Sequence, residues 1–181
     1  MTQILQIYYT KGTIVKEKLE SLITNIPDFP KKGVMFKDIN PLLEVHLKEV
    51  VELMSKQIDW SNIDAVIGIE SRGFILGAAM AVQNNVGFIP IRKKGKLPPP
   101  VVSQAYTLEY GEDILEMALN DTVKRVVLVD DVLATGGTYN AARELCLKNN
   151  YDVKAFSVVI DLQFLNQLHK EIPNLYSIFN Y

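Results

Sequence analysis

Apolar side chains recur with helical spacing in four stretches of the chain and form shorter runs between them. The spacing of three and four residues predicts helices over residues 15–26, 43–58, 74–82 and 138–148. The shorter apolar runs predict buried strands over residues 65–69, 87–91, 126–129 and 153–160. Strands that alternate with helices indicate an α/β fold with a mostly parallel sheet covered on both faces. Such a sheet binds ligands in the crevice at the carboxyl ends of its strands.

Two segments depart from this alternation, and the last twenty residues are weakly patterned. Residues 27–41, PDFPKKGVMFKDINP, contain three prolines and a glycine, so we expect a loop without regular structure there. The stretch RKKGKLPPPVVSQ, residues 92–104, is basic, rich in proline and too polar for a core. Residues 105–110 and 114–119 then flank Gly111, which predicts a two-stranded ribbon.

The composition is that of a soluble globular protein and narrows the possible partners. The length of 181 residues suits one domain, with 48% hydrophobic and 22% charged residues. The net charge of -2 gives no general attraction to nucleic acid, and no apolar stretch reaches the 18 residues that predict a membrane span. The single cysteine, Cys146, excludes an internal disulfide and fits a helix core position. The apolar run in the first residues is too short for a signal peptide, so we expect a cytoplasmic protein.

The stretch RVVLVDDVLATGGTYNAARELC, residues 125–146, carries the clearest chemistry. Two carboxylates, Asp130 and Asp131, follow the predicted strand, and Ala134-Thr135-Gly136-Gly137-Thr138 opens the predicted helix. Backbone N–H groups that converge at a helix N-terminus bind anions, whereas a plain glycine turn with Thr138 as the N-cap is the simpler alternative. Carboxylates repel phosphate but accept hydrogen bonds from hydroxyls. A sugar phosphate satisfies both features.

This motif resembles the 5-phosphoribosyl diphosphate (PRPP) motif of the type I phosphoribosyltransferases. Four further segments are similar to successive segments of the adenine-specific members of that family, in the same order: IPDFPKKGVMFKDINPLL, ESRGFILG, IRKKGKLP and YTLEYGED. The resemblance implies a type I phosphoribosyltransferase-like fold in which helices flank the sheet and a β-ribbon forms a hood. It further implies one domain over residues 1–181, with a mobile hood over about 93–119 and a base-recognition loop over about 27–40.

The same resemblance implies the reaction and its partners. The family transfers the 5-phosphoribosyl group of PRPP to adenine and releases AMP and pyrophosphate, a step of purine salvage. It implies Mg²⁺ held mainly by the substrate, a homodimer, and neither nucleic acid nor a membrane as partner. A basic run such as Arg92, Lys93, Lys94 and Lys96 is usually a solvated loop. Its position before the ribbon of the hood that the resemblance implies favours diphosphate binding instead.

Site roles follow from the resemblance residue by residue. The 5'-phosphate is assigned to the backbone of Ala134, Thr135, Gly136, Gly137 and Thr138, and the ribose hydroxyls to Asp130 and Asp131. Pyrophosphate is assigned to Ser71, Arg72, Arg92, Lys93 and Lys96. Adenine is assigned to Met35 and Lys37, and the hood residues are the catalytic Glu109 and its neighbour Tyr110. The family also holds the peptide before the pyrophosphate-loop serine in the cis form, which predicts a cis bond between Glu70 and Ser71.

Two departures from the family pattern affect these expectations. Lys37 stands where arginine is usual, and it keeps the charge but loses the planar fork, so only its backbone contact with adenine is carried over. A triple proline, residues 98–100, replaces the usual proline-glycine-proline. Two other functions stay open: a regulatory protein that keeps the PRPP fold as a sensor and binds nucleic acid, and a transferase for another purine.

Overall fold

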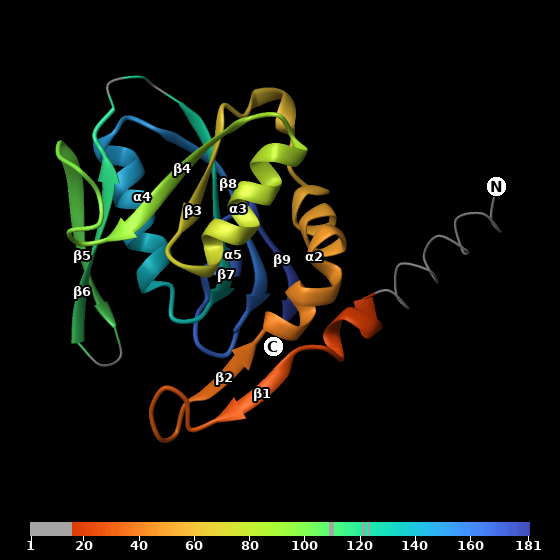
Figure 1. The fold of residues 1–181 in the computed structure, drawn as a ribbon. Helices are drawn as coiled ribbons and strands as arrows, with labels where there is room; N and C mark the ends of the chain where they lie inside the picture. Colours follow the sequence, from red (N-terminus) through yellow and green to blue (C-terminus); the bar gives the residue numbers. More distant parts are fainter. Residues whose placement is uncertain (1–15, 109–110, 121, 123) are drawn as a thin grey trace, which may run out of the picture. The chain divides into compact units, whose positions relative to one another are not determined.

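A seven-stranded sheet lies at the centre of the unit Val51–Tyr181 (Figure 1). The computed structural model describes residues 16–108, 111–120, 122 and 124–181. The strand order is β5-β6-β4-β3-β7-β8-β9; β6 pairs antiparallel with β5 and β4, and the other pairs are parallel. The strands are β3 (Ala65–Ile69), β4 (Gly87–Lys93), β5 (Val101–Leu108), β6 (Gly111–Ala118), β7 (Arg125–Leu133), β8 (Asp152–Asp161) and β9 (Leu175–Asn180).

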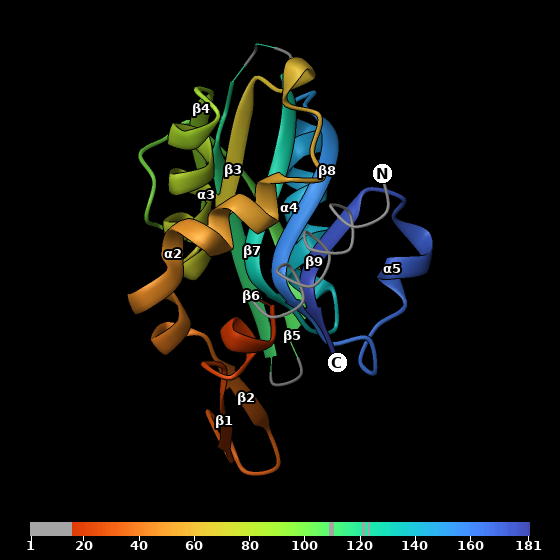
Figure 2. The ribbon, with the colours of Figure 1, turned by 90° about the vertical axis from the view of Figure 1, so that its right-hand side faces the viewer.

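Helices α3 (Arg72–Gln83) and α4 (Gly137–Lys148) cover opposite faces of this sheet (Figure 2). Successive side chains of a strand point to opposite faces, and β3 follows this rule. Its Ile67 and Ile69 pack in one buried cluster with Leu145 of α4. Gly68 faces α3 instead, where a Cβ would lie 2.6 Å from the carbonyl oxygen of Gly73. A short 3-10 helix η1 (Trp60–Asn62) and helix α5 (Leu168–Glu171) complete the unit.

The ribbon β5–β6 extends the sheet at one edge and contacts α4. Leu115 and Met117 of β6 belong to the same buried cluster as Leu145, and Lys148 Nζ donates to the Ser103 carbonyl at 2.6 Å. Cys146 is fully buried in this cluster, and burial raises the pKa of its thiol to about 12. The predictions of a two-stranded ribbon and of a core cysteine are therefore confirmed.

The unit Met1–Val50 contains a β-hairpin that the sequence pattern did not predict. Strand β1 (Thr24–Pro27) pairs antiparallel with β2 (Met35–Asp38), so the helix predicted over residues 15–26 was wrong beyond residue 20. The apolar residues at 22, 23 and 26 fit helical spacing, but Ile26 lies opposite Phe36 in the hairpin. Pairing across the hairpin thus outweighs a short periodic pattern next to a proline.

The loop expected over residues 27–40 is likewise more ordered than its composition suggested, because it contains strand β2. Asp28 accepts a hydrogen bond from Gly33 N at 2.6 Å, and Gly33 has a φ of 88°, which a glycine adopts easily. Helix α2 (Asn40–Ser55) follows, with a non-helical backbone at His46. The turn at Gly33 was predicted correctly, but strand β2, which follows it, was not predicted.

The α/β fold class with a mostly parallel sheet is confirmed, as are the other predicted strands and helices within a few residues of their ends. Strand β7 is longer than predicted and includes both acids of the central motif. The weakly patterned C-terminal residues form α5 and β9, of which β9 pairs parallel with β8. Among the residues that the structure describes, no helix is both long and apolar enough to cross a membrane.

Candidate active site

The carboxyl ends of β3 and β7 bring together the segments that the sequence analysis singled out. These two strands are parallel neighbours, paired from Ala65 with Val126 to Gly68 with Val129. The chain continues from β3 through α3 to β4 on one side, and from β7 through α4 to β8 on the other. The strand order therefore diverges between β3 and β7, and a ligand crevice is expected at such a point in an open α/β sheet.

Asp130 and Asp131 lie within β7, beyond the last residue that pairs with β3. Their residues are 9% and 8% exposed, and Asp130 Oδ1 accepts a hydrogen bond from Asp131 N at 2.9 Å. Burial raises the pKa of Asp130 well above its usual range, and the charge of Asp131 raises it further against the opposing effects of that hydrogen bond and of Arg72. Two acids are thus held side by side where hydroxyl donors would stabilise them.

Helix α3 approaches this pair closely enough for Arg72 to form an ion pair with Asp131. The approach depends on Gly73, because a Cβ there would lie 2.7 Å from the carbonyl oxygen of Val129 and 3.2 Å from Asp130 Oδ1. Ser71 is the N-cap of α3, and the peptide bond between Glu70 and Ser71 is cis, as predicted. The ESRG segment and the acid pair, 60 residues apart, therefore form one cluster.

The loop after β7 presents the start of α4. Gly136 is the N-cap, with a left-handed φ of 90°, and it has no side chain with which to cap the helix. Thr138 lies inside α4 rather than at its N-cap, so the simpler alternative of a threonine-capped turn does not hold. The first N–H groups of an α-helix lack partners within the helix, and its dipole is positive at this end. The loop over residues 134–138 can therefore bind an anion.

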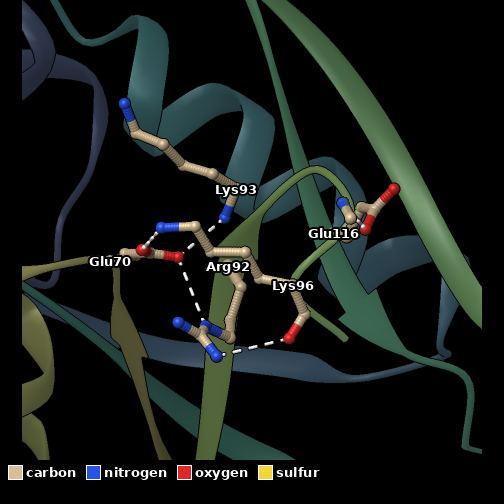
Figure 3. A network of polar contacts seen from close by, with 6 residues as sticks. Glu70, Arg92, Lys93, Lys96 and Glu116 are labelled. Atoms are coloured by element: carbon tan, nitrogen blue, oxygen red, sulfur yellow. Dashed lines mark hydrogen bonds and ion pairs between the residues drawn. The ribbon is translucent and has the colours of Figure 1, made fainter. Parts of the chain in front are cut away.

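The basic residues near the end of β4 converge on Glu70, a residue that the sequence analysis did not assign. This carboxylate accepts from Lys96 Nζ at 2.6 Å, Lys93 N at 2.9 Å and Arg92 Nε at 3.3 Å. Figure 3 shows the three donors around Glu70. Burial alone would raise the pKa of Glu70, but these contacts outweigh it and lower the pKa to about 2. No local spacing could reveal this partner, because it lies 22 to 26 residues away in sequence.

Two further carboxylates hold the same region. The ammonium group of Lys93 turns away from Glu70 and pairs with Asp113 Oδ2 on β6 at 3.1 Å. Glu116, which is 6% exposed, accepts from Gly95 N at 2.8 Å (Figure 3). The turn between β4 and β5 is therefore fastened both to the start of α3 and to the ribbon.

The remaining predicted site residues belong to the unit Met1–Val50 or fall outside the described residues. Met35 and Lys37 belong to strand β2 of the unit Met1–Val50, and Met35 is 54% exposed. Glu109 and Tyr110 fall outside the described residues; in the sequence they follow β5 and precede β6. Their assignments to adenine binding and catalysis stay predictions.

Comparisons with known proteins agree with this arrangement. The family model described as the phosphoribosyl transferase domain matches residues 38–176. The chain is 47% identical over 165 residues to an adenine phosphoribosyltransferase of Bdellovibrio bacteriovorus, covering 90% of this chain and 99% of that protein.

Two solved structures are similar in fold over nearly the whole chain. An adenine phosphoribosyltransferase from Rhodothermus marinus superposes with a TM-score of 0.85 at 37% identity and covers 93% of this chain and 99% of its own. An enzyme from Giardia lamblia complexed with 9-deazaadenine superposes with a TM-score of 0.78 at 35% identity, covering 92% and 97%.

The Glu70 carboxylate should contribute stability that depends on pH. Because its pKa is lowered, the contribution is present above the usual value of 4.5 and is lost as the pH falls through about 2. We expect Glu70→Gln to lower the free energy of unfolding at pH 7 by about 1 kcal/mol, since Arg92 and Lys96 are partly exposed. Chemical unfolding of both proteins should show this difference shrinking from about pH 5 to about pH 2.

Glu144→Gln is the matched control, because Glu144 makes only a 3.6 Å contact with Arg143 and both side chains are about half exposed. Its effect should be small at every pH. A Glu70→Gln difference that stays constant over the acid range would contradict the ion-pair account.

Proposed function

This chain belongs to the adenine phosphoribosyltransferases of the phosphoribosyl transferase family, and we propose that it makes AMP and pyrophosphate from adenine and PRPP. The observation that carries this function is the convergence of two anion-binding segments at one sheet edge. The first segment is ESRG, whose Arg72 begins helix α3, and the second is the loop over residues 134–138, whose Gly136 is the N-cap of α4. The acid pair of β7 contacts the first segment through Arg72 and precedes the second in the chain. A phosphorylated sugar that carries a diphosphate matches that order of positive and negative groups.

The ribose 5-phosphate part of PRPP is assigned to β7 and the start of α4. Backbone N–H groups of residues 134–138 donate to the 5'-phosphate, where the helix dipole favours negative charge. Asp130 and Asp131 accept hydrogen bonds from the two ribose hydroxyls. The raised pKa of Asp130 supports this role, since a buried acid gains from a hydroxyl partner.

The diphosphate is assigned to Ser71, Arg72, Arg92, Lys93 and Lys96. Arg72 suits this role because its planar fork can donate to two phosphate oxygens. Arg92 and Lys96 are now paired with Glu70, and their side chains are 34% and 49% exposed, so they can exchange that carboxylate for a phosphate oxygen. Lys93 would make the same exchange from Asp113.

Magnesium is the cofactor that we propose, held mainly by diphosphate oxygens and water. Mg²⁺ takes oxygen ligands and commonly keeps several waters beside substrate phosphates. In the ranges that the structure describes, no group of three or more His, Cys, Asp or Glu residues is placed so that it could hold a metal ion. When bound to the diphosphate, the ion offsets the negative charge that develops on the leaving group.

The hood and the base-recognition loop complete the proposal. We assign the ribbon and its connections, about residues 93–119, to a hood that closes over the substrates and excludes water from C1'. Glu109 in the hood, with Tyr110 beside it, takes the N9 proton of adenine as N9 bonds to C1' and the diphosphate leaves. Met35 and Lys37 contact the adenine edge through their backbone. The homodimer stays a prediction.

Selection of the base tests the proposed function as a whole. Adenine has an acceptor at N1 and a donor at its 6-amino group, and hypoxanthine reverses both. If backbone groups of residues 35–37 hydrogen-bond to this edge, the wrong base leaves buried polar groups unpaired, at a cost of about 1–3 kcal/mol each. We therefore expect adenine to be used roughly 10² to 10⁴ times more efficiently than hypoxanthine. Initial rates with adenine, hypoxanthine, guanine and xanthine, in the presence of PRPP and Mg²⁺, measure it.

Lys37→Arg is the matched variant for this assay, and it should keep the preference because the reading is by backbone. Hypoxanthine or guanine used within tenfold of adenine would contradict the adenine assignment. Failure of every base to release pyrophosphate would instead favour the regulatory sensor.

Asp131→Asn should weaken PRPP binding without unfolding the protein. A hydrogen bond to a charged group contributes roughly 1.5–3 kcal/mol, so removal of the charge should cost about tenfold or more in affinity by calorimetry. Asp152→Asn is the control, because Asp152 lies at the amino end of β8 and pairs with Lys154. Equal PRPP affinity in wild type and Asp131→Asn would rule out the ribose assignment.

Glu109→Gln should slow the chemical step and spare binding. Loss of a positioned proton acceptor lowers the single-turnover rate by about 10² or more, while PRPP affinity changes little. Glu112→Gln, three residues further along the chain, serves as the control in the same rapid-quench experiment. Native turnover by Glu109→Gln would reduce the residue to a hood contact.

A further inference from the structure

Residues 161–168 contact the loop over residues 134–138 through side chains that the proposed chemistry does not use. Asn166, which is 8% exposed, donates from Nδ2 to the Ala134 carbonyl at 2.9 Å. Its Oδ1 accepts a hydrogen bond from Leu168 N at 2.9 Å. Leu168 in turn packs against Gly136, where a Cβ would lie 2.5 Å from Leu168 Cδ1. The Asn166 carboxamide therefore contacts the loop directly at Ala134 and holds Leu168, which contacts the loop at Gly136.

Asp161 accepts one of the hydrogen bonds that fix which way that carboxamide faces. Its side chain is fully buried, and Oδ1 accepts from Asn166 Nδ2 at 3.0 Å. Among the described residues, Asp161 Oδ2 has no hydrogen-bond partner. A buried carboxylate is costly, and an apolar side chain would avoid that cost. A carboxylate and the carbonyls of Ala134 and Leu162 only accept, and Leu168 N only donates. Together they select the orientation in which Asn166 Nδ2 faces both Asp161 and Ala134.

We propose that Asn166 is a positioning residue that aims the backbone N–H groups of residues 134–138 at the 5'-phosphate, with Asp161 orienting its amide. The C=O and N–H of a planar trans peptide point in opposite directions. Holding the Ala134 carbonyl toward Asn166 therefore turns the N–H of Thr135 away from Asn166, to the other side of the loop. This inference rests on the proposed function, since it takes residues 134–138 as the phosphate loop.

The affinity ratio of AMP to adenosine isolates the phosphate contribution. Asn166→Asp keeps the size of the side chain and the acceptor for Leu168 N, but it loses the donors to Ala134 and Asp161. Asn166→Ala removes the acceptor and the donors alike. By calorimetry, we expect each variant to bind AMP about tenfold more weakly and adenosine as tightly as wild type does. A merely structural role would weaken both ligands together and leave the ratio unchanged.

Asn174→Ala is the matched control, because Asn174 also donates from Nδ2 to a backbone carbonyl, that of Lys154 at 3.0 Å, away from the phosphate loop. It should keep the wild-type ratio. If Asn166→Asp does not fold, Asn166→Ala gives the same comparison. Variants with the wild-type ratio would overturn this inference alone, whereas wild-type protein that forms no AMP from PRPP and adenine would overturn the proposed function.

Discussion

The close approach of helix α3 to strand β7 at Gly73 is the constraint on which the candidate active site depends. A Cβ at this position would lie 2.7 Å from the Val129 carbonyl oxygen, so a side chain there would push the helix away from the strand. The approach brings Arg72 to Asp131 and sets the segment after β3 beside the segment after β7. Without it, the two segments would be separate turns at the edge of a sheet rather than parts of one site.

The basic side chains of the candidate site are held in ion pairs with carboxylates. Each basic side chain assigned to the diphosphate has a carboxylate partner: Arg72 with Asp131, Arg92 and Lys96 with Glu70, and Lys93 with Asp113. These acids offset the positive charge of the four side chains, and Glu70 in particular reduces the repulsion between Arg92 and Lys96. In the proposed function, PRPP binding exchanges these carboxylates for phosphate oxygens, so the affinity for PRPP reflects a difference between two sets of contacts. Mutation of one of these acids therefore also changes the charge environment of its basic partner, and the reverse holds for mutation of the cation.

The parts of the fold and site that depend on local sequence could be predicted, and those that depend on distant pairing could not. The apolar run of β7, its two acids and the glycines at 136 and 137 lie within a dozen residues, so their order alone indicates an anion site beside carboxylates. Glu70 could not be assigned in this way, because its partners lie 22 to 26 residues later, at the end of β4 and in the turn after it. Asn166 lies in a weakly patterned segment and acts through a backbone carbonyl 32 residues earlier. The hairpin β1–β2 was missed because pairing with residues 35–38 gives residues 24–27 their extended form.

The PRPP affinity of Gly73→Ala, compared with that of Gly87→Ala, tests the dependence of the site on this close approach most directly. At Gly87 a Cβ would find its nearest neighbours at 3.5 and 3.6 Å, which is ordinary contact, so this second variant controls for loss of a glycine. Calorimetry should show PRPP binding weakened by about tenfold or more in Gly73→Ala, because the added methyl group separates α3 from β7, and little changed in Gly87→Ala. Wild-type PRPP affinity in a folded Gly73→Ala protein would contradict the account.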